Sequence, residues 1–288
     1  MRILIIGYGD VAQRFTAMLQ KSPARAAVRW FALVRKPESL TAIQNAGGQG
    51  LLGDLDDFRS LHRLAGLADV VLYLAPPPAQ GTTDPRLTRS LAALRGRTRR
   101  IVYVSTTGVY GNCHGEAIDE TRSVNPESAR AKRRVYAENA LRAKPSQWSV
   151  RLRVPGIYAR DRLPLERIQR GTPSLIFEED SYSNHIHADD LARIIWLTIF
   201  RGKAQRVYNT VDNANLKMGE WFDLVAHAYK LQPVPKLPAA ALQNLVSPEL
   251  WSFMRESRRI TNERLKKELW FTPRNVEKAL GAMERNDF

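Results

Sequence analysis

Residues 2–12 read RILIIGYGDVA, and this stretch decides the fold. The apolar run from Ile3 to Ile6 predicts a short buried strand. It is followed by Gly7-Tyr8-Gly9-Asp10-Val11-Ala12, which fits the pattern G-x-G-x-x-[GA] and opens an amphipathic helix over residues 11–20. In this pattern the first glycine permits a tight turn, the second lets a pyrophosphate approach the backbone, and a small third residue lets the helix pack on the sheet. Free N–H groups at the helix N-terminus bind phosphates, so we expect this segment to hold a dinucleotide.

The rest of the first half alternates apolar runs with amphipathic segments. The predicted strands are residues 2–6, 28–34, 50–52, 69–74, 101–104 and 146–154, and the predicted helices are residues 11–20, 38–45, 56–64 and 86–94. Strands that are apolar throughout and separated by helices indicate a parallel sheet covered on both faces. We therefore predict a doubly wound α/β (Rossmann) fold, whose ligand site lies outside the carboxyl ends of the strands.

This alternation loosens after residue 158. The sequence predicts helices over residues 161–170 and 188–200, a strand over residues 207–210, and a helical tail with prolines from residue 218. We expect residues 1–158 to form the dinucleotide-binding domain, with residues 183–213 returning to it. Residues 159–182 and 214–288 would form a smaller, mostly helical lobe that binds the substrate.

The chain carries 44 Lys and Arg residues against 29 Asp and Glu residues, a net charge of +15. The excess is mostly arginine, and it is spread along the whole sequence. Nucleic-acid modules instead cluster basic residues with stacking aromatic side chains or carry a recognition motif. We therefore expect a small-molecule substrate, a modest preference for phosphorylated ligands, and no nucleic-acid partner.

Cys113 is the one cysteine, which excludes an internal disulfide and fits a reducing cytoplasm. The first apolar run ends at a glycine turn, unlike the longer apolar region of a secretory signal. The apolar stretch at residues 194–197 is far shorter than the roughly 18 residues of a membrane span. We expect a cytoplasmic protein without a membrane partner.

The end of the second strand distinguishes NAD from NADP. An NAD site places Asp or Glu there to bind the ribose 2′-hydroxyl, whereas this chain has Val34-Arg35-Lys36. A carboxylate would repel a 2′-phosphate, while Arg35 can bind it with two hydrogen bonds. We therefore expect NADP rather than NAD, the alternative being that Arg35 and Lys36 are only solvated loop charges.

Further motifs follow the glycine turn in a consistent order. They are Gly53-Asp54-Leu55, Leu74-Ala75-Pro76-Pro77, Val104-Ser105-Thr106-Thr107-Gly108-Val109-Tyr110-Gly111, Arg153-Val154-Pro155-Gly156-Ile157-Tyr158, His185-Ile186-His187-Ala188-Asp189-Asp190-Leu191-Ala192 and Leu269-Trp270-Phe271-Thr272-Pro273. Over nearly the whole chain this order resembles the short-chain dehydrogenase/reductase superfamily, in its extended and atypical, epimerase/dehydratase-like branch. The third motif resembles the signature S-[ST]-x-x-V-Y-G of that branch.

The resemblance implies roles for several of these residues. Asp54, within its Asp-Leu segment with Leu55, would bind the adenine amine. Thr106 would bind the substrate carbonyl. The residues that would line the path of the cofactor are Ala75, Pro76, Pro77 and Pro155. The resemblance also implies a homodimer formed through the helix that carries Arg130.

The chain departs from this family at the catalytic pair Y-x-x-x-K. Aligning on Ala137-Glu138 places Arg130 at the tyrosine position and Arg134 at the lysine position, and none of the nine tyrosines has a lysine four residues later. A guanidinium stays protonated at neutral pH, so Arg130 cannot act as a general acid. Arg134 can still bind the ribose hydroxyls. The two arginines would either grip an anionic ligand or face solvent, with Arg134 paired to Glu138 four residues on.

Few side chains are available to replace the missing acid/base. Tyr110 and His114 follow the Thr106 motif closely, Asp119 and Glu120 come next, and His185 and His187 lie further along. For each the alternative is an ordinary loop or structural role. A metal site at His185 and His187 lacks a third ligand with suitable spacing, and a thiolate at Cys113 is less expected than a small packing residue.

Two functions remain open at this point. The first is an NADP-dependent reductase, epimerase or dehydratase acting on a small polar substrate such as a sugar derivative. Hydride transfer needs only the nicotinamide and a polarised carbonyl, and Thr106 with an arginine can supply the polarisation. The second is a non-catalytic NADP(H)-binding protein with a redox-sensing or regulatory role, which the missing Tyr/Lys pair favours.

Overall fold

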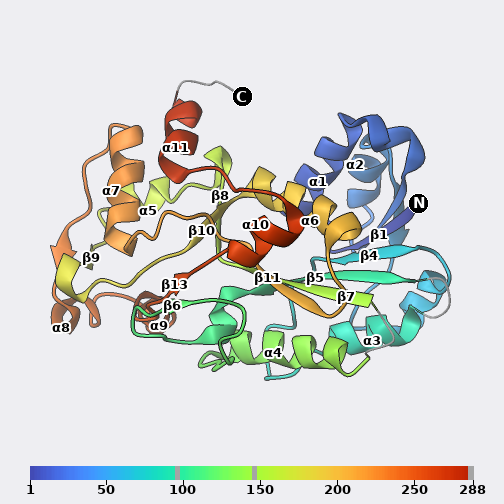
Figure 1. The fold of residues 1–288 in the computed structure, drawn as a ribbon, viewed down its shortest axis with the longest axis horizontal. Coiled ribbons are helices and arrows are strands. Elements are labelled where there is room, and N and C mark those ends of the chain that lie inside the picture. The colour runs from blue at the N-terminus through green and yellow to red at the C-terminus, as the bar shows by residue number, and fades with distance from the viewer. Residues whose placement is uncertain (95–97, 145–147, 285–288) are drawn as a thin grey trace.

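A computed structural model describes residues 1–94, 98–144 and 148–284. Its centre is a sheet of seven parallel strands in the order β11-β7-β5-β4-β1-β2-β3 (Figure 1). The strands are β1 (Arg2–Ile6), β2 (Arg29–Val34), β3 (Gln49–Leu52), β4 (Val70–Tyr73), β5 (Arg100–Thr106), β7 (Trp148–Val154) and β11 (Arg206–Asn209). The chain order reverses between β1 and β4, which is where doubly wound folds bind ligands.

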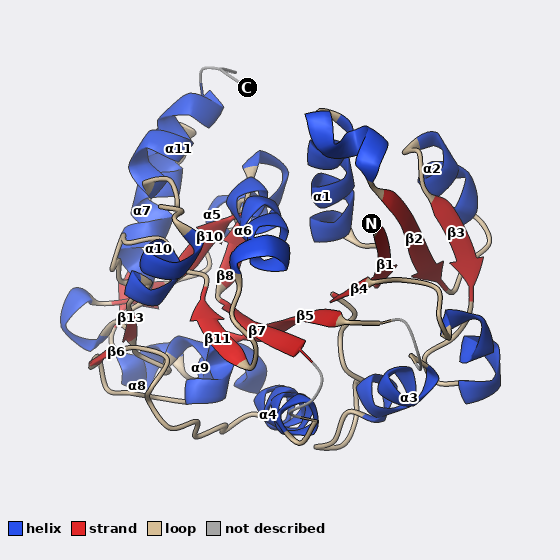
Figure 2. Cartoon of the chain, turned by 45° about the vertical axis from the view of Figure 1, so that its right-hand side comes forward, coloured by secondary structure: helices blue, strands red, loops and turns tan. Residues whose placement is uncertain are grey.

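Helices cover both faces of this sheet (Figures 1 and 2). One face carries α1 (Asp10–Gln20), α2 (Ser39–Asn45) and α6 (Ala188–Arg201), and the other carries α3 (Pro85–Ala93) and α4 (Ala129–Arg142). Alternate residues of β1 serve the two cores, since side chains along a strand point to opposite faces. Ile3 and Ile5 join the core under α1 and α6. Leu4 and Ile6 join the core above α3 and α4.

A second lobe with its own core lies at the far end of the molecule, to the left in Figure 2. Residues such as Trp221, Phe222 and Met254 fill that core. Its helices are α5 (Leu165–Gln169), α7 (Met218–Ala228), α8 (Ala239–Leu242), α9 (Pro248–Met254) and α11 (Val276–Glu284). Between the lobe and the main sheet lie α10 (Glu263–Leu269) and the two-stranded pair β8 (Gly156–Tyr158) and β10 (His185–His187).

The predicted doubly wound α/β fold is confirmed, with local differences. The helix predicted over residues 161–170 is instead a 3-10 turn, η4 (Arg160–Arg162), followed by the short α5. Pro164 separates them, because proline lacks an N–H group and holds the preceding residue extended. The segment predicted as a helix at residues 56–64 is a 3-10 helix, η2 (Phe58–Leu64). Residues 146 and 147 of the sixth predicted strand lie outside the described residues.

The tail is less purely helical than expected. It contributes two short strands, β12 (Lys236–Leu237) and β13 (Arg259–Ile260), which pair with β9 (Ser174–Leu175) and β6 (Ala117–Ile118). These pairings join segments more than 60 positions apart in sequence, which helical periodicity cannot reveal. Within the described ranges, no helix combines the length and apolar character needed to cross a membrane.

Candidate dinucleotide and substrate site

The glycine turn joins the end of β1 to the start of α1. Gly7 has a φ of +95°, and a Cβ atom there would lie 2.5 Å from the backbone nitrogen of Ala75. Gly9 differs, because a Cβ atom there would meet no described heavy atom within 4 Å beyond its chain neighbours. The first intrahelical hydrogen bond runs from Gln13 N to Gly9 O, so the preceding N–H groups point out of the helix end. A tight turn, open space above Gly9 and free N–H groups fit a pyrophosphate.

Arg35 and Lys36 are exposed directly after β2, the strand next to β1 in the parallel sheet. Their backbone therefore lies at the same edge as the glycine turn. Arg35 also acts on the neighbouring loop: the hydrogen bond from Arg86 lowers the pKa of Asp56, and Arg35 adds a smaller electrostatic effect. The two exposed cations thus stand where a ribose 2′-substituent lies in this fold.

The loop after β3 carries Asp54 and Leu55, both half-buried. Ser60 fixes the backbone of this loop, because its Oγ accepts a 2.8 Å hydrogen bond from Asp54 N and donates to Asp54 O. The Asp54 carboxylate accepts a hydrogen bond from Asp56 N at 2.9 Å. This hydrogen bond holds the Asp54 side chain through one carboxylate oxygen, Oδ1.

The segment after β4 packs directly against the glycine turn. Leu74 N donates to Ile6 O at 2.8 Å, and Ala75 and Pro77 are buried while Pro76 is exposed. Because the backbone of Ala75 presses on Gly7, the two loops form one continuous surface at the switch between β1 and β4.

Arg134 reaches from α4 to this edge of the sheet. Its Nη1 donates to Val104 O at 2.9 Å and to the Tyr103 hydroxyl at 3.0 Å, with a long contact to Ala75 O at 3.5 Å. The guanidinium carbon lies 5.5 Å from the centre of the Tyr103 ring. All hydrogen bonds between Arg134 and the described residues use Nη1, so Nη2 and Nε make none with those residues.

The alternative pairing of Arg134 with Glu138 is wrong. Glu138 is buried and bonds to Arg153 instead, with Oε2 2.7 Å from Nη2. Its Oε1 accepts a 2.6 Å hydrogen bond from the Ser105 hydroxyl. Glu138 therefore turns toward the sheet, and Arg134 reaches the edge of the sheet without it.

Thr106 ends β5, and its Oγ1 accepts a 3.2 Å hydrogen bond from Gly108 N. The side chain is half-buried, so its hydroxyl hydrogen remains free to point outward. Arg130, in the first turn of α4, is exposed. In the family that the sequence resembles, this position carries tyrosine. Here it carries a permanently charged side chain that is exposed to solvent.

The other acid/base candidates lie in unfavourable surroundings. Tyr110 is 1% exposed, its hydroxyl donates to Asn209 Oδ1 at 2.8 Å, and burial raises its pKa to about 12. His114 is exposed in a left-handed conformation, with φ of 50°. Burial raises the pKa of the Cys113 thiol, which disfavours the reactive thiolate.

The two histidines of β10 are also buried. Burial lowers the pKa of His185 to about 3 and that of His187 to about 4, so both are neutral at pH 7. His185 stacks on Trp221 with ring centroids 4.2 Å apart. No group of three or more His, Cys, Asp or Glu side chains suited to a metal ion occurs in residues 1–94, 98–144 and 148–284.

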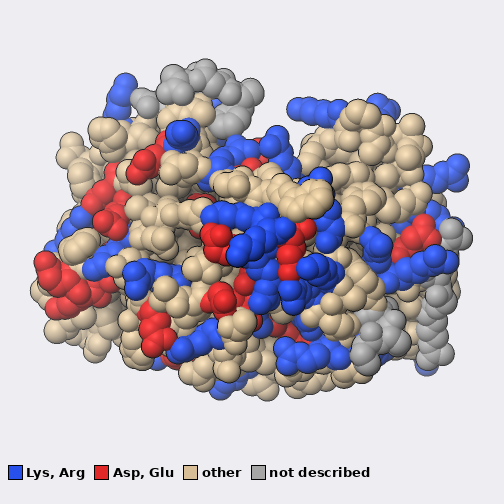
Figure 3. Space-filling model, in the orientation of Figure 1, with Lys and Arg blue, Asp and Glu red and all other residues tan. Residues whose placement is uncertain are grey.

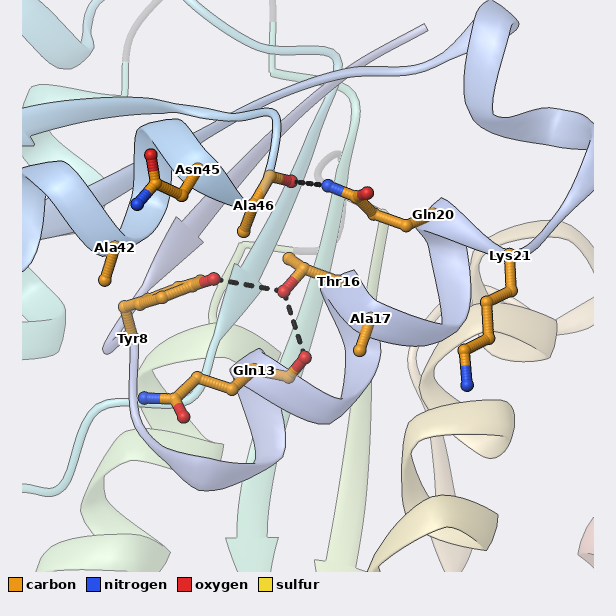
Figure 4. Close-up of a pocket in the computed structure, with 9 residues that line it drawn as sticks. All are labelled: Tyr8, Gln13, Thr16, Ala17, Gln20, Lys21, Ala42, Asn45 and Ala46. Atoms are coloured by element: carbon orange, nitrogen blue, oxygen red, sulfur yellow. Dashed lines mark hydrogen bonds between the residues drawn. The ribbon is translucent and has the colours of Figure 1, made fainter. Parts of the chain in front are cut away.

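A pocket of about 550 Å³ lies along the flank of α1, between this helix and α2 (Figure 4). The Tyr8 hydroxyl closes one part of its wall through a 3.1 Å hydrogen bond with Thr16. The full lining is Tyr8, Gln13, Thr16, Ala17, Gln20, Lys21, Ala42, Asn45 and Ala46. Gly9, Arg35 and Thr106 do not line it. The pocket therefore borders the glycine turn only through Tyr8 and otherwise runs along α1 and α2.

The basic excess is not gathered into one uniform patch on the face shown in Figure 3, where acidic and basic side chains mix around α10 and β11. Arg206 and Lys203 both pair with Glu268 there, at 2.5 and 3.3 Å. Arg264 lies 3.5 Å from Glu120. On this face acidic side chains therefore offset part of the basic charge.

Comparison with solved structures gives matches over the full length. A functionally unknown conserved protein from Silicibacter pomeroyi shares 26% identity and a TM-score of 0.82, covering 99% of each chain. A short-chain dehydrogenase/reductase superfamily protein from Agrobacterium tumefaciens with bound NAD shares 15% identity and a TM-score of 0.75, covering 100% of this chain and 98% of that one. The UDP-glucose 4-epimerase from Thermotoga maritima with UDP-glucose shares 18% identity and a TM-score of 0.75, covering 99% and 98%.

No curated protein matches the sequence. A family model described as NAD(P)H-binding matches residues 7–199, which is about two thirds of the chain and begins at the glycine turn. The solved structures named above share the fold over the second lobe as well. The chain therefore belongs to the NAD(P)H-binding family.

Proposed function

We propose that this protein is an NADP(H)-dependent oxidoreductase- or epimerase-like enzyme acting on a small polar substrate, such as a sugar derivative. The observation that carries the proposal is the open space over Gly9 at the N-terminus of α1, with Arg35 and Lys36 exposed on the neighbouring strand end. A pyrophosphate suits the first feature, and a ribose 2′-phosphate suits the second. Two solved neighbours hold UDP-glucose, one of them with NAD, which supports a substrate derived from a sugar.

Each residue of the site has a distinct role in this proposal. Arg134, held through Nη1, directs Nη2 and Nε toward the ribose hydroxyls and balances phosphate charge. The Thr106 hydroxyl donates a hydrogen bond to the substrate carbonyl and polarises it. The nicotinamide supplies the hydride chemistry when bound. Tyr110, His185 and His187 are buried, so this proposal assigns none of them as the proton donor.

The cofactor assignment is tested by fluorescence titration of the purified protein with NADPH and separately with NADH. We expect the wild type to bind NADPH with micromolar affinity. We expect Arg35→Asp to weaken the affinity for NADPH at least tenfold while changing the affinity for NADH by no more than about twofold. Glu38→Gln is a matched surface control, because Glu38 is exposed in the same loop. Equal losses for the two nucleotides would remove Arg35 from 2′-phosphate recognition.

A non-catalytic NADP(H)-binding protein is the second candidate, and the exposed Arg130 together with the buried Tyr110 favours it. The two candidates separate in an assay of NADPH oxidation with a panel of aldehydes, ketones and nucleotide sugars. Turnover that Thr106→Val or Arg134→Ala abolishes supports the enzyme. Flat traces with tight NADPH binding support a sensor or regulatory protein.

A further inference from the structure

A cluster of five charged side chains surrounds the first turn of α1. Asp10 is the first residue of this helix, and its two oxygens bind different arginines. Oδ1 lies 2.9 Å from Arg14 Nε, and Oδ2 lies 2.7 Å from Arg162 Nη1. Arg14 also contacts Asp161 at 2.7 Å and Asp189 at 3.3 Å. The cluster therefore joins three elements, α1, η4 and the start of α6.

The partners from η4 come from the segment that leads into the second lobe. Asp161 bonds to an arginine of α1, while its neighbour Arg162 bonds to an aspartate of α1, so the two ion pairs run in opposite directions. Asp10 and Arg162 are 152 positions apart in sequence. This crossed pairing fixes η4 against the glycine turn.

Asp10 places a negative charge in the first turn of α1, at the helix end where a phosphate would bind. A carboxylate in the first turn of a helix is favourable for the helix itself, but it repels a pyrophosphate at the same N–H groups. The cluster has three carboxylates and two guanidinium groups, a net charge of −1. Without Arg162 the net charge would be −2, and one oxygen of Asp10 would lose its partner.

We propose that Arg162 is a cofactor-positioning residue of the second-lobe segment, which neutralises Asp10 so that the pyrophosphate of a dinucleotide can occupy the N-terminus of α1. The inference rests on the proposed function, because it requires the glycine turn to bind a dinucleotide. It adds a residue from outside the glycine-turn motif, and it couples cofactor affinity to the placement of η4.

The test is a double-mutant cycle on the dissociation constant for NADPH, with Arg162→Gln, Asp10→Asn and the double variant. Arg162→Gln should weaken binding about tenfold, the size expected for one partly screened charge near a phosphate. The double variant should bind within about twofold of Asp10→Asn, because the repelling carboxylate is absent. Arg160→Gln, an exposed arginine on the same 3-10 turn, should stay within about twofold of the wild type. The loss of NADPH affinity in Arg162→Gln should shrink at 0.5 M salt, because charges are then screened over roughly 4 Å.

The outcomes separate the inference from the proposed function. If Arg162→Gln weakens NADPH binding as much in the Asp10→Asn background as in the wild type, Arg162 does not act through Asp10. The same holds if Arg160→Gln weakens NADPH binding as much as Arg162→Gln does. In either case the inference fails while dinucleotide binding stands. If the wild type binds neither NADPH nor NADH, both the proposed function and the inference fail. Thermal unfolding of each variant checks that the fold is retained.

Discussion

Glu138 and Arg153 form an ion pair in which neither side chain is more than 3% exposed, with Oε2 2.7 Å from Nη2. The pair joins α4 to β7, and Ser105 on β5 donates to the other carboxylate oxygen. The Arg153 guanidinium also lies 4.6 Å from the centre of the Tyr110 ring. One buried carboxylate thus connects a helix to two strands directly behind the Thr106 loop.

Removing this carboxylate should destabilise the protein strongly. Glu138→Ala leaves the Arg153 charge buried without its partner, and breaking such a pair costs about 3–5 kcal/mol. The free energy of unfolding from urea denaturation should fall by that amount. Glu116→Ala, whose pair with Arg122 spans 2.8 Å at the surface, should cost less than about 1 kcal/mol. Equal effects of the two substitutions would show that burial of the pair is energetically unimportant.

Asp212 should make stability depend on pH. Burial raises its pKa to about 7, and the Asp190 carboxylate adds to the shift. Its Oδ1 accepts a hydrogen bond from Ala214 N, while Oδ2 has no partner among the described residues. Because the folded pKa lies above the unfolded value of about 3.9, the native state binds more protons between about pH 4 and 7. Stability should therefore fall as pH rises through this window.

The variant Asp212→Asn should flatten this dependence. The amide oxygen can still accept from Ala214 N, and no charge remains to be buried. We expect the free energy of unfolding at pH 8 to rise by about 1–3 kcal/mol, with little change at pH 4. Glu178→Gln, on the exposed turn after β9, is the charge-matched control. A variant less stable than the wild type at pH 8 would contradict this account.

Glu268 should show the opposite pH dependence. The hydrogen bond from Arg206 lowers its pKa to about 2, and the Tyr208 hydroxyl donates to it at 2.7 Å. Its contribution is therefore complete above about pH 4.5 and is lost as pH falls toward 2. Glu268→Gln should cost about 1 kcal/mol at pH 7, and the cost should shrink near pH 3. Glu263→Gln, from an exposed pair with Lys266, should change stability little at either pH.

The sequence predicts most of what is local in this molecule. The glycine turn needs only neighbouring residues, so its position and its form could be predicted from the pattern at Gly7 and Gly9. The ion-pair partners of side chains such as Glu138 and Asp10 could not be predicted, because they depend on tertiary packing. Glu138 lies one helical turn from Arg134, and spacing alone favours that pair, but the sheet-facing side of α4 delivers the carboxylate to Arg153. The approach of Arg162 to Asp10 depends on how η4 packs against α1, which no sequence periodicity records.

The two glycines of the turn should respond differently to alanine. A Cβ atom on Gly7 would lie 2.5 Å from Ala75 N and 2.7 Å from its Cα, at a φ of +95° that alanine rarely adopts. Neither backbone can move without displacing β1 or the loop after β4. Gly7→Ala should therefore lower the free energy of unfolding by several kcal/mol, or prevent folding.

Gly9→Ala should leave the fold intact. The backbone φ of Gly9 is −98°, which any residue adopts, and the added methyl group would enter open space. If that space receives the pyrophosphate, the methyl group blocks its approach to the backbone. We expect a melting temperature within about 2 °C of the wild type and at least a tenfold loss of NADPH affinity. Unchanged affinity in the folded Gly9→Ala variant would place the dinucleotide away from the glycine turn, whatever Gly7→Ala does.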